Sequence, residues 1–360
     1  MIRFLFRRLA TMIFTALCLT FIVFFLTNLP PNLEKLAKSE ASVRMPDAEV
    51  ARWIESHGYA RPIVLRYGEW LGVVPGWTRT EDGQTTGRCI AHGTDAALAP
   101  RYCGIMQGDW GFSTVFKESV RNIVLTRLGT TGWLMMSVML VMVPAALLMG
   151  VLAGMREGSR TDRTLSILSI GSTATPEYVS GVVLIVLLSS STIGLSPLLY
   201  EWGWIAEKTL FKGTATSAMD KITFWNFALP VMTIALYGTG YIARMTRASM
   251  AEVMTAQYIR TARLKGVSFG NVVLRHALRN ALIAPFTVIM LQVPWLLNGV
   301  VIVETLFNYK GFGWTLVQAA GNNDIELLLA CSVVAVLVVL ATQLISDIGY
   351  VYLNPRIRMS

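Results

Sequence analysis

The densest group of chemically usable side chains is a basic stretch between residues 244 and 280. It carries seven Lys and Arg residues against one acid, Glu252. Cationic groups at this density can pair with acids on a protein partner or with anionic lipid headgroups. Small and apolar residues alternate with the charges up to Gly266, and glycine can adopt the positive φ that ends a helix. The pattern predicts two short helices broken at Gly266 rather than an unstructured basic loop.

Carboxylate and amide side chains inside apolar runs form a second candidate site. Polar groups within a membrane are costly and often mark the path of a solute. Glu177 could attract a cationic group of a solute, or it could serve the backbone that Pro176 leaves without a partner. Gln292 and Asn298 could line a path or pair within a helix bundle. Glu177, Gln292 and Asn298 are therefore the candidate residues of a translocation path.

Two of the four cysteines, Cys89 and Cys103, lie outside the apolar runs. In an oxidising compartment a disulfide between them would close a short loop and contribute roughly 3 kcal/mol. Two unpaired thiols are the alternative. A zinc site is disfavoured because only His92 lies nearby, which leaves the ligand set incomplete. We predict a disulfide.

The elements that must position these side chains are membrane helices. The chain has 360 residues, of which 54% are hydrophobic and 15% charged, and its mean hydropathy is +0.53. A globular chain carries about 25% charged residues. Six runs of roughly 17 to 25 residues could cross a ~30 Å hydrocarbon core as helices. These runs are Leu9–Leu29, Gly129–Ala153, Leu165–Ser190, Phe227–Ala243, Ala281–Val303 and Leu327–Leu353. They are continuous and not alternating, so we predict an all-α polytopic membrane protein with six transmembrane helices rather than a β-barrel.

The distribution of Lys and Arg predicts the orientation. Short loops rich in these residues favour the cytoplasm. Fifteen of the 31 lie in segments that share one side with the N-terminus, and four lie in the two short loops of the other side. We expect both termini in the cytoplasm. The expected domains are the N-terminal segment with the first span (1–29), an extracytoplasmic, periplasmic subdomain (30–128) with a disulfide-closed insertion (73–105), and a core (129–360) containing the cytoplasmic loop 244–280.

Several short motifs, in order along the chain, resemble those of one family. The stretch Tyr258-Ile259-Arg260-Thr261-Ala262-Arg263-Leu264-Lys265-Gly266 closely resembles the cytoplasmic EAA motif of ABC importer permeases. Other similar segments are Tyr67–Gly72, Gly108–Gly111, Thr175–Tyr178, Glu304–Phe307, Gly311–Gly313, and Asp347 with Pro355–Ile357. Together they resemble the first permease subunit of the dipeptide/oligopeptide/nickel branch over nearly the whole chain. Arg260, Gln343 and Asn354 depart from the usual motif residues, and 73–105 looks like an insertion.

The resemblance implies a type I ABC importer permease fold in the bacterial inner membrane, and a transport subunit rather than an enzyme. It implies a second homologous permease subunit, two ATP-binding subunits and a periplasmic substrate-binding protein as partners, and no nucleic acid. The helix ending near Gly266 would be a coupling helix that contacts an ATPase subunit. The implied contact residues are Tyr258, Ile259, Arg260, Thr261, Ala262, Arg263, Lys265 and Gly266. Peptides lead as substrates, with nickel chelates, opines, glutathione-like compounds and sugars conjugated to small acids left open.

The sequence itself is consistent with transport by this chain and ATP hydrolysis by separate subunits. The sequence contains no Gly-x-x-x-x-Gly-Lys-Ser/Thr phosphate-binding motif, so we expect no cofactor in this chain and expect ATP and Mg²⁺ on partner ATPase subunits. A self-contained secondary transporter of small solutes, the alternative function, would show inverted repeats and midplane charge pairs. An intramembrane enzyme would show paired Asp, Ser–Lys or His-Glu-x-x-His groups. Neither pattern is evident in the sequence.

Overall fold

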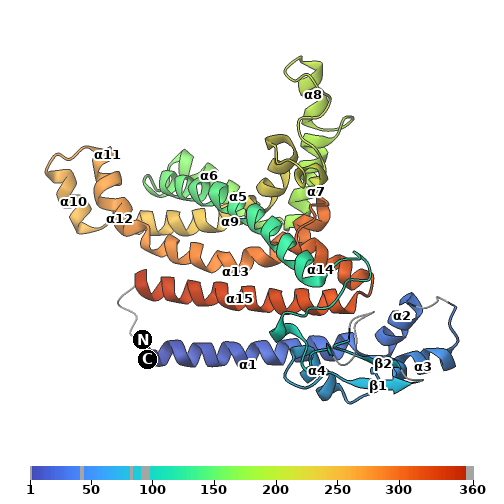
Figure 1. The fold of residues 1–360 in the computed structure, drawn as a ribbon. Coiled ribbons are helices and arrows are strands. Elements are labelled where there is room, and N and C mark those ends of the chain that lie inside the picture. Colours follow the sequence, from blue (N-terminus) through green and yellow to red (C-terminus); the bar gives the residue numbers. More distant parts are fainter. Residues whose placement is uncertain (1, 41–43, 82–83, 91–97, 354–360) are drawn as a thin grey trace. The chain divides into compact units, whose positions relative to one another are not determined.

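The computed structural model describes residues 2–40, 44–81, 84–90 and 98–353. These residues are mostly helical (Figure 1). The chain divides into two units: Met1–Leu128 with Thr315–Val338, and Gly129–Trp314 with Val339–Ser360. Two long helices, α5 (Val120–Gly154) and α15 (Ile325–Leu353), contribute residues to both units.

The first unit is built around one apolar core. Its remaining helices are α1 (Ile2–Thr27), α2 (Pro30–Glu40), α3 (Asp47–Ser56), α4 (Ile63–Leu71) and the 3-10 helix η2 (Ile105–Gln107). The sequence predicts a helix over 47–57, opened at Pro46-Asp47 and closed by Gly58. Helix α3 confirms it: the helix begins after Pro46 and ends before Gly58, whose φ is +74°. The core consists of Phe24, Leu33, Leu36, Trp70, Ile325 and Leu329.

The segment 73–105 contains a β-hairpin and the predicted disulfide. Strands β1 (Thr78–Glu81) and β2 (Gln84–Gly87) pair antiparallel, with Thr78 opposite Gly87. The Cys89–Cys103 disulfide is confirmed. The turn-forming residues of 73–105 predict an irregular course, and this prediction is wrong for the two strands. An Asp-Gly pair between two Thr-rich stretches is a hairpin signal, and these two residues, 82–83, lie outside the described part, as does His92.

The second unit is organised around α9 (Phe224–Met254). Its other helices are α6 (Arg160–Ala174), α7 (Glu177–Ser189), α8 (Leu195–Glu201), the 3-10 helix η3 (Thr216–Ala218), α10 (Gln257–Leu264), α11 (Phe269–Asn271), the π-helix η4 (Val272–Ala277), α12 (Leu278–Ala281) and α13 (Ile283–Leu306). The helices α6, α7 and α13 all pack on α9. Helix α14 (Phe312–Gly321) has residues in both units.

Small residues allow α9 to lie close to its neighbours. A Cβ on Gly150 or Gly154 of α5 would press on Thr246 or on the backbone of Arg247 in α9. A Cβ on Gly240 of α9 would press on α6. Membrane helices commonly pack through such small residues because lipid supplies little hydrophobic drive for association.

Three helices in the described residues are long and apolar enough to cross a membrane: Phe6–Thr27, Val120–Gly154 and Ile325–Gly349. Two bent pairs, Arg160–Ala174 with Glu177–Ser189 and Phe269–Ala281 with Ile283–Leu297, raise the number to five if each is one span. The predicted span 227–243 lies within α9, which is not among these because Gly, Thr, Tyr and Arg dilute its apolar residues.

The bend between α6 and α7 measures 108°. Glycine and proline inside the apolar run 165–190 predict interruptions at Gly171, Pro176 and Gly181. Only Pro176 falls at the break, and the two glycines lie inside helices. Proline disfavours helical backbone at the preceding residue, here Thr175, which is extended. Gly181 instead brings α7 close to Leu306 and Thr233.

Candidate functional site

The loop 244–280, predicted to lie on the cytoplasmic side and called here the inner loop, has the helix–Gly–helix form that its sequence predicted. Helix α10 ends at Leu264, and Gly266 adopts φ +76°. The N–H of Gly266 donates to the carbonyl of Arg263 at 3.0 Å, and the N–H of Val267 donates to that of Ala262 at 3.2 Å. This left-handed cap satisfies carbonyls that the helix end leaves open. The loop then continues as helix from Phe269.

Helix α10 has one buried and one exposed face. Ile259 and Ala262, three residues apart, pack inward in a small core. The rest of that core consists of Met250, Val272, Val273, Ala277 and Ala281. Ile259 and Ala262 therefore support the helix from the inside. The family resemblance implied that they contact an ATPase subunit, but both side chains are buried.

The exposed face of α10 carries the other predicted contact residues. They are Tyr258, Arg260, Thr261, Arg263, Lys265 and Gly266. Leu264 adds to this face with 80% of its surface exposed, and the sequence had not singled it out. Tyr258 is held in place, because its hydroxyl accepts a hydrogen bond from Asn280 Nδ2 at 2.9 Å. A supported helix with a basic, partly apolar outer face is suited to a groove on an acidic partner.

A partly buried ion pair fixes α9 to the start of α6. Ser159 caps α6 by accepting from the N–H of Asp162 at 3.1 Å. The Asp162 carboxylate, 2% exposed, accepts two hydrogen bonds from Arg247, from Nε and from Nη2, the latter at 2.8 Å. Sequence reasoning missed this pair, although the Ser-x-x-Asp spacing of a capping motif was visible.

Phe269, the first residue of α11, makes a second contact between the loop 244–280 and the connection between α5 and α6. The guanidinium of Arg156, between α5 and α6, lies 5.2 Å from the centre of the Phe269 ring. Arg263 of α10 lies 6.0 Å from the same ring. Such cation–π contacts contribute about 0.5–1 kcal/mol at exposed sites. The connection between α5 and α6 is thus attached to the loop 244–280.

The candidate path residues are partly brought together. Glu177 is the first residue of α7, and a Cβ on Gly299 of α13 would lie 2.8 Å from its Oε2. Gln292 is 7% exposed, and its Nε2 has no hydrogen-bond partner in the described residues. Positions 292 and 299 are two turns apart on one face of α13. The side chain of Asn298 lies outside the described part.

A buried carboxylate, Glu304, organises the turn between α13 and α14. It is fully buried and accepts hydrogen bonds from Thr131 Oγ1 and from the N–H of Trp314, the latter at 2.9 Å. Thr131 in turn accepts from the N–H of Phe312 at 2.7 Å. A side chain on Gly311 would collide with Glu304 and Thr131. This network holds the turn between α13 and α14.

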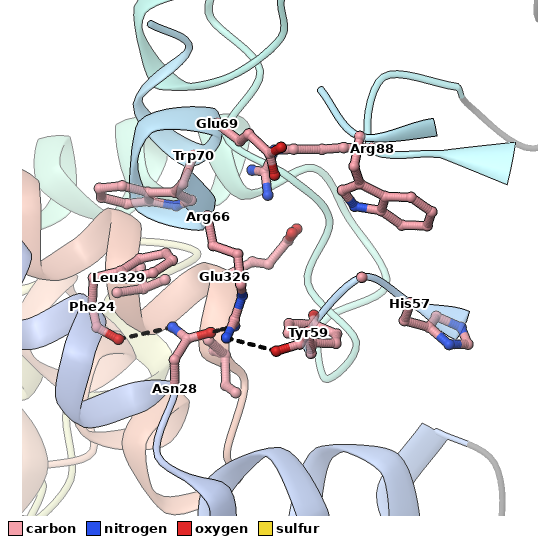
Figure 2. Close-up of a pocket in the computed structure, with 13 residues that line it drawn as sticks. Phe24, Asn28, His57, Tyr59, Arg66, Glu69, Trp70, Arg88, Glu326 and Leu329 are labelled. Atoms are coloured by element: carbon pink, nitrogen blue, oxygen red, sulfur yellow. Dashed lines mark hydrogen bonds between the residues drawn. The ribbon is translucent and has the colours of Figure 1, made fainter. Parts of the chain in front are cut away.

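A cavity of about 180 Å³ lies in the first unit (Figure 2). Arg66, 8% exposed, donates to Asn28 Oδ1 and to the carbonyl of Tyr59, the latter at 3.0 Å. Burial lowers the pKa of Arg66, which nevertheless remains charged at neutral pH. Glu69 accepts from Arg61. Ligand pockets usually measure about 300–1,000 Å³, so this small cavity, whose Arg66 and Glu69 side chains bond within the unit, is assigned to the packing of the unit.

The long apolar helices and the attached basic loop are typical of a polytopic membrane protein. The family described as "Binding-protein-dependent transport system inner membrane component" matches residues 146–359. The chain belongs to this family. It is therefore a permease subunit of the ABC transporter type, whose ATP hydrolysis occurs on separate subunits, and it is not itself an enzyme.

Three relatives support this assignment. The chain is 35% identical over 280 residues to the di/tripeptide transport system permease protein DppB of Pseudomonas aeruginosa (strain UCBPP-PA14), covering 74% of this chain and 82% of the relative. It is 27% identical over 361 residues to the oligopeptide transport system permease protein AppB of Bacillus subtilis (strain 168), with 99% of each chain covered. It is 31% identical over 253 residues to the glutathione transport system permease protein GsiC of Escherichia coli (strain K12), covering 70% of this chain and 76% of the relative.

Proposed function

We propose that this chain forms half of the translocation path of an ATP-driven importer for peptides or a related small solute delivered by a periplasmic binding protein. The observation that carries the proposal is α10, whose basic outer face is exposed while Ile259 and Ala262 attach it to the protein. The names of the relatives, which include di/tripeptide, oligopeptide and glutathione permeases, favour peptides over nickel chelates, opines or sugar conjugates.

The proposed assembly contains this chain, a second homologous permease subunit, two ATPase subunits and the binding protein. ATP and Mg²⁺ would be held by the ATPase subunits alone. Six spans with both termini in the cytoplasm would place the inner loop 244–280 next to the ATPases. They would place residues 30–128, with the insertion 73–105, on the periplasmic side. Fifteen Lys and Arg residues on the inner side support that orientation.

The proposed mechanism begins at the exposed face of α10. Arg260, Arg263 and Lys265 would pair with acidic groups of the ATPase subunit, and Tyr258 and Leu264 would enter its groove. Closure of the ATPases around nucleotide would then displace α10. Because α10 is packed on the rest of the loop, the displacement would reach the membrane helices as a rigid movement.

The proposed path follows one face of α13. Glu177 against Gly299, and Gln292 two turns away, would line it, with Asn298 as a third candidate. Glu177 would attract a cationic group such as a peptide ammonium. Replacing Glu177 by Gln should therefore reduce uptake of a peptide with a free N-terminus more than uptake of its N-acetylated form. Equal effects on both would argue against a contact with the ammonium group.

The function is tested by reconstitution. The chain should co-purify with an ATPase and a second permease, and the complex in liposomes should accumulate labelled trialanine only with ATP on the ATPase side and binding protein on the other. Uptake by the isolated chain without ATP would instead establish the alternative, a secondary transporter. Mass spectrometry of the ligand carried by the binding protein would identify the natural solute.

The insertion 73–105 is proposed to help the binding protein dock or to cover the outer mouth. Its compactness supports this: a hairpin and a disulfide restrict the segment. Deleting residues 73–105 should weaken binding-protein affinity or uptake. Unchanged values of both would remove this role.

A further inference from the structure

One ion pair, with Asp162 buried and Arg247 partly exposed, joins the base of the inner loop to the start of the broken helix. Arg247 lies on α9, ten residues before α10 begins at Gln257. Only Thr255 and Ala256 interrupt helix between these points. Across this break, Ile259 of α10 and Met250 of α9, one turn from Arg247, belong to the same apolar core. Displacement of α10 would thus arrive at Arg247 with little loss.

The bonding of Asp162 leaves its carboxylate no freedom. Besides the two bonds from Arg247, it accepts from the N–H of Gly158 at 2.8 Å and from Ser166 Oγ at 3.2 Å. Four bonds match the capacity of an ionised carboxylate. A two-point pair between Arg and carboxylate fixes direction as well as distance, so α6 has to follow α9 when α9 rotates.

Nearby contacts make the joint tighter. A Cβ on Gly154 would lie 2.6 Å from the carbonyl oxygen of Arg247, so α5 lies directly against α9 at this point. The Phe269 ring under Arg156 attaches the later part of the inner loop to the same short connection between α5 and α6. Both sides of α10 are therefore linked to the segment that opens α6.

The far end of α6 lies at the candidate path. Helix α6 has 15 residues, about 22 Å, before the bend at Pro176. Glu177 follows at once and rests against Gly299 of α13. Rotation of α6 about its first turn would thus move the bend and the residues that begin α7.

A stabilising role alone does not account for the pair. Replacing a buried ion pair by well-packed apolar residues is often neutral or stabilising, because removing two charges from water is costly. An apolar contact would hold the helices together equally well, but it would let them slide. A bidentate pair at a single register prevents sliding.

We propose that Asp162 and Arg247 are positioning residues for transport, forming the joint through which movement of the inner loop reaches the broken helix α6–α7. This inference rests on the proposed function as an ATP-driven permease. It adds a specific route from the ATPase contact to the path. The pair acts through α6 and touches neither the solute nor the ATPase.

The test compares variants in the complete complex with its partner permease, ATPases and binding protein, reconstituted in liposomes. Asp162→Asn keeps the shape but removes the charge, and Arg247→Lys keeps the charge but removes the two-point geometry. Arg163→Gln is the matched control, because Arg163 is exposed on the next residue of α6 and lies outside the pair. The readouts are complex recovery, ATP hydrolysis and labelled trialanine accumulated per ATP hydrolysed.

Both pair variants should assemble and hydrolyse ATP while accumulating about tenfold less peptide per ATP, a ratio typical of energetic coupling between sites. The double variant should lose no more than the worse single one, since the two residues act as a unit. Normal uptake per ATP in both variants would overturn the inference, as would loss of the assembled complex in both. Failure of the wild-type complex to transport would contradict the proposed function instead.

Discussion

At the scale of single residues, Gly266 allows a test of whether transport depends on the left-handed cap that ends α10. Its φ is +76°, and a Cβ there would meet no atom within 4 Å. Substitution therefore changes backbone preference without causing a clash. A left-handed conformation costs other residues roughly 1–2 kcal/mol. We expect Gly266→Val to displace the end of α10 and lower uptake per ATP by about fivefold or more in the reconstituted complex.

A second glycine provides the control for this prediction. Gly270 in α11 also faces open space but lacks a positive φ. Gly270→Val should leave uptake per ATP close to the wild-type value. Gly266→Asn should fall between, because asparagine tolerates the left-handed region. An equal loss in both valine variants would show that φ is not the cause.

Glu304 allows a stability prediction at the same scale. Glu304→Ala removes the acceptor of the Trp314 N–H and of the Thr131 hydroxyl. A buried donor left without a partner costs about 1–3 kcal/mol. We expect a clear fall in the thermal unfolding midpoint of the purified protein in detergent, with a smaller fall for Glu304→Gln. Thr305→Ala on the exposed side of α13 is the control, and an equal fall there would contradict the role of the network.

The residue scale also shows how far sequence reasoning reaches. The cap at Gly266 could be predicted because it depends on neighbouring residues. The spacing of three between Ile259 and Ala262 indicates that both lie on one face of the helix. The sequence prediction instead assigned nearly the whole motif to the ATPase contact, without separating its two faces. The pair of Asp162 and Arg247 could not be read, because 85 residues separate the partners and only helix packing sets their register.

At the scale of elements, the strongly apolar helices were predictable and the bent ones less so. A long apolar run reports length and solvent, which sufficed for α1, α5 and α15. Helix α9 has many buried residues but contains Gly, Thr, Tyr and Arg among its apolar residues. Hydropathy alone therefore does not identify it as a membrane span. The 108° bend at Pro176 depends on which neighbours receive the free backbone groups, and that information lies in the fold.

The disulfide carries the prediction for the 73–105 element. Breaking Cys89–Cys103 with the double substitution to serine releases a loop for which closure contributes roughly 3 kcal/mol. We expect faster proteolytic cleavage within residues 73–105 and a lower thermal midpoint for the purified protein. Cys18→Ser, at an exposed free cysteine of α1, is the control. Cleavage at the wild-type rate in the double variant would show that the hairpin and its packing hold the segment without the bond.

At the scale of the whole molecule, the proposed assembly with the ATPase subunits depends on the outer face of α10. Leu264 is 80% exposed there, beside Arg260 and Arg263. An exposed leucine in a basic setting is suited to the apolar centre of a contact whose rim carries charge. Leu264→Asp places a carboxylate in that centre and reverses the local attraction. We expect recovery of the ATPase subunits with this chain to fall about tenfold or more, since central interface residues often contribute at least 2 kcal/mol.

The control for assembly is Leu198→Asp on α8. Leu198 is 44% exposed, and α8 belongs to the same unit as α10. This change adds the same carboxylate to another exposed helix of the same unit, so ATPase recovery should stay near the wild-type level. Raising the salt concentration should weaken the wild-type contact through screening of the basic residues. It should not restore the Leu264 variant, whose defect is a charge buried in an apolar contact. Equal ATPase recovery for both aspartate variants would mean that the ATPase binds elsewhere on this chain.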